Sequence, residues 1–174
     1  GCGQFCTKPG LLMGVRSADF TALVEKLGTS LAALPAQSML NAGTLRSYEQ
    51  GVQRLHEHSG VRHIAGAPQQ GNQAWPQLFQ ASAQLLLDAD KVLQEEVFGP
   101  ATVVVEAADD AQLQHIISAL NGQLTFTLIA DEADLGQCAP LISQLEQKAG
   151  RLLLNGYPTG VEVCASMQHG GPYP

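Results

Sequence analysis

The chain has 174 residues, of which 45% are hydrophobic and 14% charged, and its formal net charge is −7. This length suits one domain with its own core, and the composition excludes a disordered chain. The acidic balance, without any cluster of lysines or arginines, argues against a nucleic-acid partner. The low share of charged residues indicates a surface that something else partly covers. No apolar run reaches the ~20 residues that span a membrane, and no signal peptide is visible.

The four cysteines have spacings that match neither a disulfide framework nor a CxxC metal or redox motif. They are Cys2, Cys6, Cys138 and Cys164. A reducing, cytoplasmic setting is the simpler interpretation. No spacing of metal-ligating residues is found either, so no metal is expected.

The first half of the chain alternates between apolar runs and helical periodicity. Residues 10–15 (GLLMGV) predict a buried strand, and Ser17 is a suitable N-cap for a helix that Pro35 ends. A second helix is expected over 43–58, where the apolar residues share one face. Residues 75–87 are expected to be extended, because a proline near their start breaks a helix.

The second half continues the alternation. The expected elements are a strand over 101–107, a helix from Asp109 or Asp110, a strand over 124–130, a helix over 132–149 and a strand over 151–156. The first of these strands is the clearest, because its β-branched run is compatible with burial on both faces. Pro140 lies inside the last helical pattern and predicts a kink or a break there.

Strands and helices that alternate in this way predict an α/β fold. The expected architecture is a parallel-type twisted sheet with helices on both faces, in a single domain over residues 1–174. The glycine-rich start is not the GxGxxG loop of dinucleotide sites, and no GxxxxGK[ST] loop occurs. The residues alone therefore show no phosphate-binding loop of the usual kind.

Cys6 is the first candidate for chemistry, in the irregular segment GCGQFCTKPG. A cysteine attacks only as its thiolate, and nearby positive charge or backbone N–H groups lower its pKa. The glycines let backbone amides approach the sulfur or an oxyanion, and Lys8 is a source of positive charge. A buried, inert cysteine is the commoner case, so this segment alone leaves both interpretations open.

The segment QEEVFGP (94–100) is the second candidate. Two adjacent carboxylates, the second of them Glu96, end a helical turn, and Phe98 leads toward the strand that follows. A binding role competes here with an acidic surface turn whose phenylalanine anchors the core. Ligands in α/β sheets gather where strands end, whereas Glu96 precedes a strand, so composition favours the surface turn.

The closing segment, 155–174, is rich in Gly and Pro and carries apolar residues such as Tyr157 and Val161. Apolar residues on a loop suit the wall of a binding pocket, and they suit a buried structural loop almost as well. His169, ahead of two glycines, suits a base or a group that polarises a thiol. The other histidines are interpreted as surface residues: His56, His58, His63 and His115.

The order of these three segments is more specific than any one of them. GQFC, then EEVFGP, then PTGVEVC and HGGPYP resemble the C-terminal catalytic domain of the aldehyde dehydrogenase superfamily. The resemblance covers essentially the whole chain. The closing motif is most similar to the branch that contains α-ketoglutaric semialdehyde (2,5-dioxopentanoate) and fatty-aldehyde dehydrogenases.

The resemblance implies a role for each matching residue. Cys6 is the nucleophile that forms a thiohemiacetal and then a thioester with an aldehyde, and His169 lies close to it. Glu96 holds the nicotinamide ribose of NAD or NADP, and Phe98 lies beside the nicotinamide. The loop over 157–163 lines the aldehyde tunnel, and its expected substrate contacts are Tyr157, Thr159 and Val161.

The resemblance also implies that the chain is a domain fragment. In this superfamily the cofactor-binding domain, a general-base glutamate and an oxyanion-hole asparagine precede the nucleophile, and a C-terminal tail crosses to a neighbouring subunit. Only five residues precede Cys6 here. We therefore expect a small-molecule aldehyde as substrate and NAD(P) bound mainly by the absent domain. We also expect a homo-oligomeric full-length protein, no nucleic-acid or membrane partner, and no aldehyde oxidation by the chain alone.

Two other functions stay open from the residues themselves. One is a hydrolase or acyltransferase in which Cys6 attacks and His169 acts as the base. The other is a non-catalytic interaction module with an inert thiol. Glu96 distinguishes the hydrolase from a dehydrogenase. A hydrolase does not need this carboxylate, whereas its loss in a dehydrogenase is expected to weaken the use of the cofactor.

Overall fold

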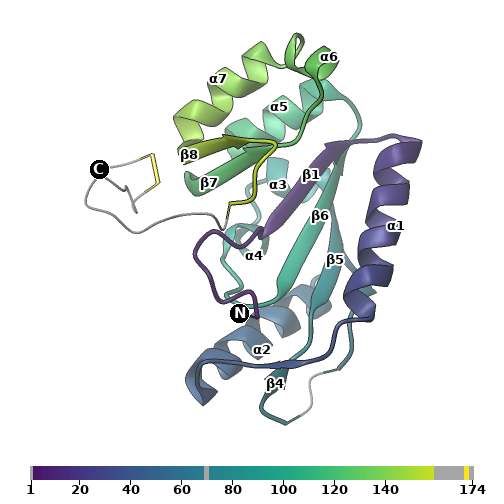
Figure 1. The fold of residues 1–174 in the computed structure, drawn as a ribbon, viewed down its shortest axis with the longest axis vertical. Helices are drawn as coiled ribbons and strands as arrows, with labels where there is room; N and C mark the ends of the chain where they lie inside the picture. Colours follow the sequence, from purple (N-terminus) through teal and green to yellow (C-terminus); the bar gives the residue numbers. More distant parts are fainter. Residues whose placement is uncertain (1, 69–70, 159–170, 173–174) are drawn as a thin grey trace.

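The computed structural model describes residues 2–68, 71–158 and 171–172, and a four-stranded sheet forms its centre (Figure 1). The strand order is β1-β6-β5-β3. β1, β6 and β5 run parallel to one another, whereas β3 joins the edge antiparallel to β5. The bounds are Leu11–Val15 for β1, Val61–Ala65 for β3, Gln77–Ser82 for β5 and Ala101–Ala107 for β6. The predicted α/β fold with a mainly parallel sheet is confirmed.

β6 lies in the interior of the sheet, between β1 and β5. Its run of β-branched residues suits a pleated strand. Val103, Val104 and Val105 are all buried, although successive side chains point to opposite faces. Both faces of this strand are therefore covered, and the strand predicted over 101–107 is confirmed with the same bounds.

The helices begin largely where the sequence predicts them. Ser17 caps the first one, because its Oγ accepts a hydrogen bond from Phe20 N at 3.0 Å. The helices are α1 (Ala18–Ala32), α2 (Ala42–Glu57), α3 (Ala83–Leu87), α4 (Lys91–Gln94), α5 (Asp110–Ala119), α6 (Glu132–Leu135) and α7 (Ala139–Lys148). Within the described ranges, none is long and apolar enough to cross a membrane.

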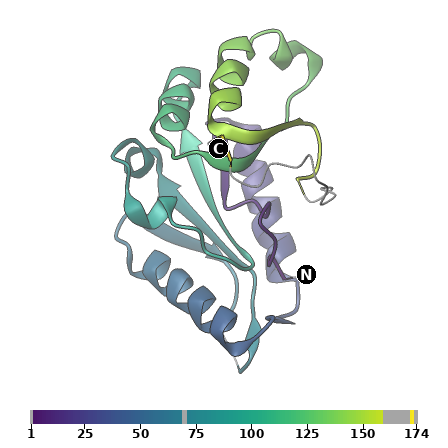
Figure 2. The same cartoon turned by 90° about the vertical axis from the view of Figure 1, so that its left-hand side faces the viewer.

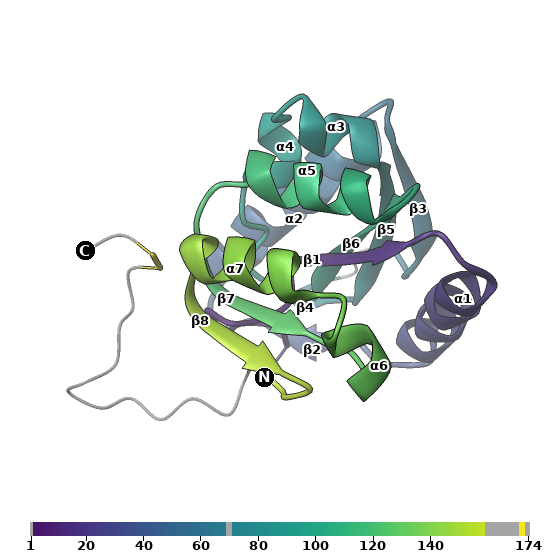
Figure 3. The same cartoon turned by 90° about the horizontal axis from the view of Figure 1, so that it is seen from above.

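Helices cover both faces of the sheet, as predicted. α1 packs against β3 and β5 on one face, where a Cβ on Gly28 would lie 3.9 Å from Leu78 Cδ2. Figure 3 shows α3 and α5 on the side opposite to α1. The main core forms on that second side, from buried residues of α2, β5, β6 and α5 that include Tyr48, Leu55, Phe79, Val105 and Ile116.

Four further strands form two small sheets of their own. β2 (Gln37–Ser38) pairs antiparallel with β4 (Gln73–Ala74), and β7 (Gln123–Leu128) pairs parallel with β8 (Ala149–Leu154). α7 packs against β8 and against α5, so β7 and β8 join the rest of the fold through a shared helical layer. Figure 2 shows this unit beyond the end of the main sheet. The last two predicted strands, over 124–130 and 151–156, are therefore present, but they pair with each other in a separate two-stranded sheet.

Two predictions at prolines have different outcomes. The break expected at Pro140 is confirmed, because α7 begins there with the proline in its first turn. The extended segment expected over 75–87 is wrong in its second half. β5 ends at Ser82, whose Oγ accepts a hydrogen bond from Gln84 N at 3.2 Å and so caps α3. The proline restricts only the start of the strand, and the serine then begins a helix.

Tyr48 of α2 joins the core to the connections at the beginning of β5 and β6. Its side chain is fully buried, and its hydroxyl donates to Trp75 O at 2.6 Å and lies 3.4 Å from Pro100 O. Trp75 lies just before β5 and Pro100 just before β6. One buried phenol therefore holds the Trp75 carbonyl and lies against the Pro100 carbonyl, which also accepts a hydrogen bond of 2.8 Å from Gln77 N.

Replacing Tyr48 by Phe is expected to lower the free energy of unfolding by about 1–2 kcal/mol, because the Trp75 carbonyl loses the hydroxyl that donates to it from the core. Urea denaturation of the two proteins measures the difference. Tyr157→Phe is the matched control, since it removes the same hydroxyl from a side chain that is 88% exposed. Equal effects of the two substitutions would contradict the role given to Tyr48.

Candidate functional site

Cys6 lies on the loop that precedes β1, and its side chain is exposed. A backbone hydrogen bond of 3.0 Å from Lys8 N to Phe5 O closes a turn around it. The next side chain, Thr7, is only 3% exposed and holds the turn to the body of the chain. The structure thus presents this thiol to solvent and does not seal it in the core.

The Cys6 loop is bonded to the beginning of β6, ninety residues along the chain. The Lys8 ammonium donates to the Ala101 carbonyl. Thr102 Oγ1 donates to Pro9 O at 2.9 Å, and Val103 N donates to Gly10 O at 2.9 Å. Figure 1 shows the N-terminal loop beside this end of β6. The sequence-predicted nucleophile and the QEEVFGP segment therefore belong to one region, the edge of the sheet where β1, β5 and β6 begin. We call it the amino edge.

Two glycines make this contact possible. Gly3 has a φ of +63° and Gly99 a φ of +147°, which residues with side chains rarely adopt. A Cβ on Gly3 would lie 2.6 Å from the Gly99 carbonyl carbon, and one on Gly99 would lie 2.4 Å from Tyr48 Cδ2. The backbone of the loop at Gly3 therefore packs on the backbone of the turn at Gly99. The turn in turn packs on the aromatic ring of Tyr48.

Glu96 and Phe98 lie on the turn between α4 and β6. α4 ends at Gln94, and Glu95 follows as its C-cap with an extended backbone, so the next residues continue to the strand. The Glu96 side chain is exposed, whereas Phe98 is half-buried. Val97, between them, is anchored so closely on α2 that a Cβ on Gly51 would lie 2.9 Å from Val97 Cγ1. The turn thus presents one carboxylate and one aromatic ring from a fixed backbone.

Lys8 carries the positive charge nearest in sequence to Cys6, and the structure gives it an additional role. Burial lowers the pKa of Lys8 to about 8, while the negative charge of Glu96 acts in the opposite direction and raises it. The Lys8 ammonium and the Glu96 carboxylate are therefore close enough for their charges to attract each other. Sequence reasoning considered Lys8 only as a charge for the thiol and missed its bond to Ala101.

A second thiol lies on the same loop in a different environment. Cys2 Sγ is 3.7 Å from Met39 Sδ and 3.6 Å from Gln37 O, and its side chain is half-buried. Burial raises the pKa of Cys2, and the nearby positive N-terminus only partly offsets this effect. Cys2 therefore resembles a packed sulfur, whereas Cys6 is the accessible one.

The predicted substrate loop is described only at its beginning. Tyr157 follows β8, and its side chain is 88% exposed. Thr159, Val161 and His169 lie outside the described residues, so their predicted roles stay predictions.

The histidines interpreted as surface residues separate into two groups. His56, His63 and His115 are exposed, as predicted. His58 is not a free surface residue: its Nε2 lies 3.1 Å from Asp90 Oδ2, and both side chains are less than a quarter exposed. The correction has a simple cause. Asp90 caps α4, which packs against the helix that ends beside His58, and this tertiary contact leaves no local sequence signal.

Two curated relatives match this chain from end to end. The α-ketoglutaric semialdehyde dehydrogenase of Acinetobacter baylyi is 51% identical over 100% of this chain, which corresponds to 34% of the relative. α-Ketoglutaric semialdehyde dehydrogenase 2 of Azospirillum brasilense is 44% identical over 100% of this chain and 33% of that protein. The chain is homologous to these aldehyde dehydrogenases. It spans about a third of the length of both relatives, and no protein-family model matches it.

Solved structures of other aldehyde dehydrogenases share the fold. The Δ1-pyrroline-5-carboxylate dehydrogenase of Mycobacterium tuberculosis matches 93% of this chain with a TM-score of 0.76 and 20% identity, over 31% of its own length. The lactaldehyde dehydrogenase of Escherichia coli matches 93% with a TM-score of 0.70 and 23% identity, over 34% of its length. The aldehyde dehydrogenase fold expected from the motifs is therefore confirmed.

Iodoacetamide is expected to modify Cys6 faster than Cys2 or Cys138. Cys6 is exposed, while the raised pKa of Cys2 and of Cys138 leaves less thiolate at neutral pH. Burial is the main cause of both shifts, and Asp134 and Asp110 add to it at Cys138. Peptide mass spectrometry over a time course at neutral pH gives the three rates. Equal rates for Cys2 and Cys6 would contradict this order.

The Lys8 amine is expected to make stability depend on pH between about 8 and 10.5. In this interval the unfolded chain keeps the proton that the folded chain has lost, so the free energy of unfolding rises with pH. Urea denaturation of the wild type and of Lys8→Met at several pH values measures the effect. Other titrating groups cancel in the difference between the two proteins, and a difference that stays constant over the interval contradicts the prediction.

Proposed function

We propose that this chain is the catalytic-domain portion of an NAD(P)-dependent aldehyde dehydrogenase that oxidises α-ketoglutaric semialdehyde, or a similar aldehyde, to the acid. One observation carries the proposal: the exposed Cys6 thiol lies on a loop that is bonded to the beginning of β6 and packs on Gly99, in the turn that carries Glu96 and Phe98. The 51% identity to the Acinetobacter baylyi relative supports the substrate class.

Cys6 is the nucleophile in this proposal. Its thiolate adds to the aldehyde carbonyl and forms a thiohemiacetal, and backbone N–H groups of the glycine-rich loop stabilise the developing oxyanion. A nicotinamide cofactor, when bound, accepts the hydride that leaves the aldehyde carbon. Water then attacks the acyl carbon attached to the sulfur, which releases the acid and returns the thiol. Exposure of the sulfur supports this role, because both the aldehyde and the water need access to it.

Glu96 and Phe98 fit a nicotinamide nucleoside. The exposed Glu96 carboxylate has two acceptor oxygens, which suit the adjacent hydroxyl groups of a ribose. Phe98 offers the half-buried face of an aromatic ring two residues away, which suits a planar base. The rigid turn between α4 and β6 would hold the two groups at a constant separation.

The segment after β8 supplies the aldehyde-binding wall and a polar group in this proposal. Tyr157 supports it as a large, exposed side chain at the beginning of the segment. We assign Thr159 and Val161 to contacts with the substrate and His169 to a position near the Cys6 thiol, on the strength of the motif resemblance alone.

We further propose that the chain acts as one domain of a larger enzyme. Its relatives are about three times as long, and large apolar side chains stand exposed on the described surface, among them Phe5, Ile129, Leu154 and Tyr157. Apolar groups exposed in this number suit a face that another part of the protein covers. In this proposal the remaining part supplies the general base and most of the cofactor contacts, and the protein assembles as a homo-oligomer.

A chimera tests the function directly. This chain replaces the matching segment of the Acinetobacter baylyi relative, and production of reduced cofactor is followed with NAD+ or NADP+ and α-ketoglutaric semialdehyde. The chimera is expected to turn over, whereas Cys6→Ser is expected to lose activity on the order of a thousandfold or more. Glu96→Gln is expected to raise the KM for the cofactor roughly tenfold, because a charge-assisted hydrogen bond is lost.

Matched controls make the assignment specific. Glu95→Gln changes the neighbouring carboxylate, which lies 3.3 Å from Arg54 on the surface, and is expected to leave the cofactor KM unchanged. Cys138→Ser is expected to keep full activity. The isolated chain is expected to give no turnover. If Glu96→Gln behaves like Glu95→Gln while Cys6→Ser abolishes ester hydrolysis, the proposed function gives way to the Cys-dependent hydrolase.

A further inference from the structure

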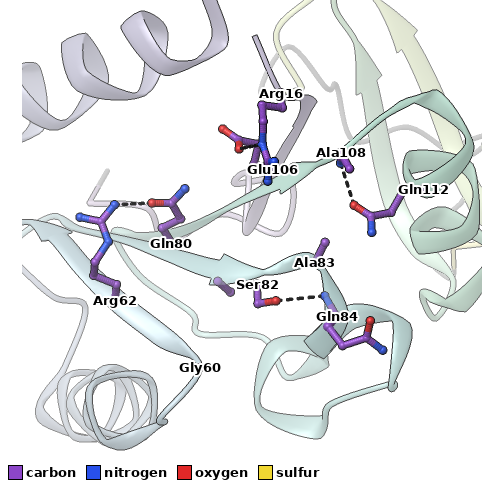
Figure 4. A pocket seen from close by; sticks show the side chains of 11 residues that line it. Arg16, Gly60, Arg62, Gln80, Ser82, Ala83, Gln84, Glu106, Ala108 and Gln112 are labelled. Carbon is purple, nitrogen blue, oxygen red and sulfur yellow. Dashed lines mark hydrogen bonds and ion pairs between the residues drawn. The ribbon is translucent and has the colours of Figure 1, made fainter. Parts of the chain in front are cut away.

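A crevice of about 420 Å³ opens at the edge of the sheet where β1, β5 and β6 end (Figure 4). This carboxyl edge is opposite to the amino edge that carries Cys6 and Glu96. The crevice is lined by the residue that follows β1, by residues in or next to β3, β5 and β6, and by the beginnings of α3 and α5. The side chains that matter for its chemistry are Arg16, Arg62, Gln80, Glu106 and Gln112.

The topology of the sheet produces this crevice. β1 and β6 are neighbours, and α1 follows β1 on one face while α5 follows β6 on the other. The two connections therefore diverge and leave the space between the strand ends open. In open α/β sheets, ligands bind at the carboxyl ends of strands where the connections separate in this way.

The polar groups of the crevice are mainly donors. Gln80 Oε1 accepts a hydrogen bond from Arg62, and Gln112 Oε1 accepts one of 2.7 Å from Ala108 N. Each amide oxygen already accepts one hydrogen bond, whereas neither NH2 group donates one within residues 2–68, 71–158 and 171–172, so the NH2 groups can donate to a ligand. Figure 4 shows the two glutamines on opposite sides of the crevice.

Arg16 adds a further set of donors. Its Nε bonds Glu106 Oε1 at 2.7 Å, and its side chain is 68% exposed. Within residues 2–68, 71–158 and 171–172, its terminal nitrogens have no hydrogen-bond partner. A planar guanidinium held through one nitrogen is well placed to bind an oxyanion with the others.

The charge of the crevice differs from that of the chain. Its lining has two arginines against one glutamate, a local charge of +1, whereas the whole chain has a formal net charge of −7 with only nine lysines and arginines. Two of these nine cations thus line one crevice from its two sides, Arg16 after β1 and Arg62 in β3, with the ends of β6 and β5 between them. Such a spot attracts anions on a molecule that otherwise repels them.

We propose that the carboxyl-edge crevice is a binding site for a small organic anion that carries a carboxylate or phosphate group. Arg16 and Arg62 bind the anionic oxygens, and the NH2 groups of Gln80 and Gln112 bind the remaining acceptors of the ligand. Glu106 competes with the ligand for Arg16 and sets the affinity. The site is separate from the amino edge, and it does not rest on the proposed function.

Calorimetric titration of the full 174-residue chain with glutarate, and separately with inorganic phosphate, tests the proposal. Sodium chloride at matched ionic strength serves as the blank. At least one of the two anions is expected to bind saturably at one site per chain, and the one that binds identifies the preferred group. Arg16→Gln and Arg62→Gln are each expected to weaken binding at least tenfold. Glu106→Gln is expected to strengthen it several-fold, because it releases Arg16 from its partner.

Arg46→Gln is the matched control, because it removes the same charge from an exposed position of α2 that does not line the crevice. It is expected to leave binding unchanged. The side-chain amide signals of Gln80 and Gln112 in an NMR titration give a second readout, and they are expected to shift with the same affinity. Absence of saturable binding by both anions overturns the proposal. So does an equal loss of affinity in Arg46→Gln and Arg62→Gln, which would indicate attraction by net charge alone.

Discussion

At the amino edge of the sheet, Gly3 meets the carbonyl of Gly99 so closely that a Cβ on Gly3 would lie 2.6 Å from the carbonyl carbon. This contact brings the beginning of the chain against a turn that lies more than ninety residues away. Three hydrogen bonds extend it along the two segments, from Lys8, Thr102 and Val103. This contact holds the loop that carries the exposed Cys6 thiol against the turn that carries Glu96 and Phe98, and a side chain at either glycine would disrupt it.

The contact is in turn supported from the core. Gly99 packs on the ring of Tyr48, and the hydroxyl of this residue holds the carbonyl of Trp75. α2, which carries Tyr48, packs on the sheet through its buried face. A line of direct contacts thus leads from the largest buried side chains to the turn, and from the turn to the loop that carries the thiol. Such support is what a reactive group needs if its position is to be fixed by the fold.

Much of this fold is readable from local patterns, and the remainder depends on contacts between distant segments. The strand over 101–107 and the cap at Ser17 follow from a β-branched run and a single hydroxyl, and both are confirmed. α3 was not predicted, because Pro76 near the start of the segment indicated an extended chain throughout. The signal for the helix was Ser82 in the middle of the segment, which caps it. The pair His58–Asp90 and the bond from Lys8 to Ala101 have no local signal, because each joins segments far apart in sequence. For the candidate site, the motifs indicated Cys6 and Glu96 individually, whereas the packing of Gly3 on Gly99, which joins the loop of one to the turn of the other, has no local signal in the sequence.

β6 connects the two edges of the sheet, and its length determines how they influence each other. At ~3.3 Å per residue, its seven residues span roughly 23 Å. In physiological salt, the interaction between charges exposed to water is screened over about 8 Å. The exposed guanidinium of Arg16 and the exposed carboxylate of Glu96 therefore have no significant electrostatic interaction. A change of charge at one end of this strand reaches the other only as a mechanical displacement of the strand itself. The tight packing of three consecutive buried valines opposes that movement.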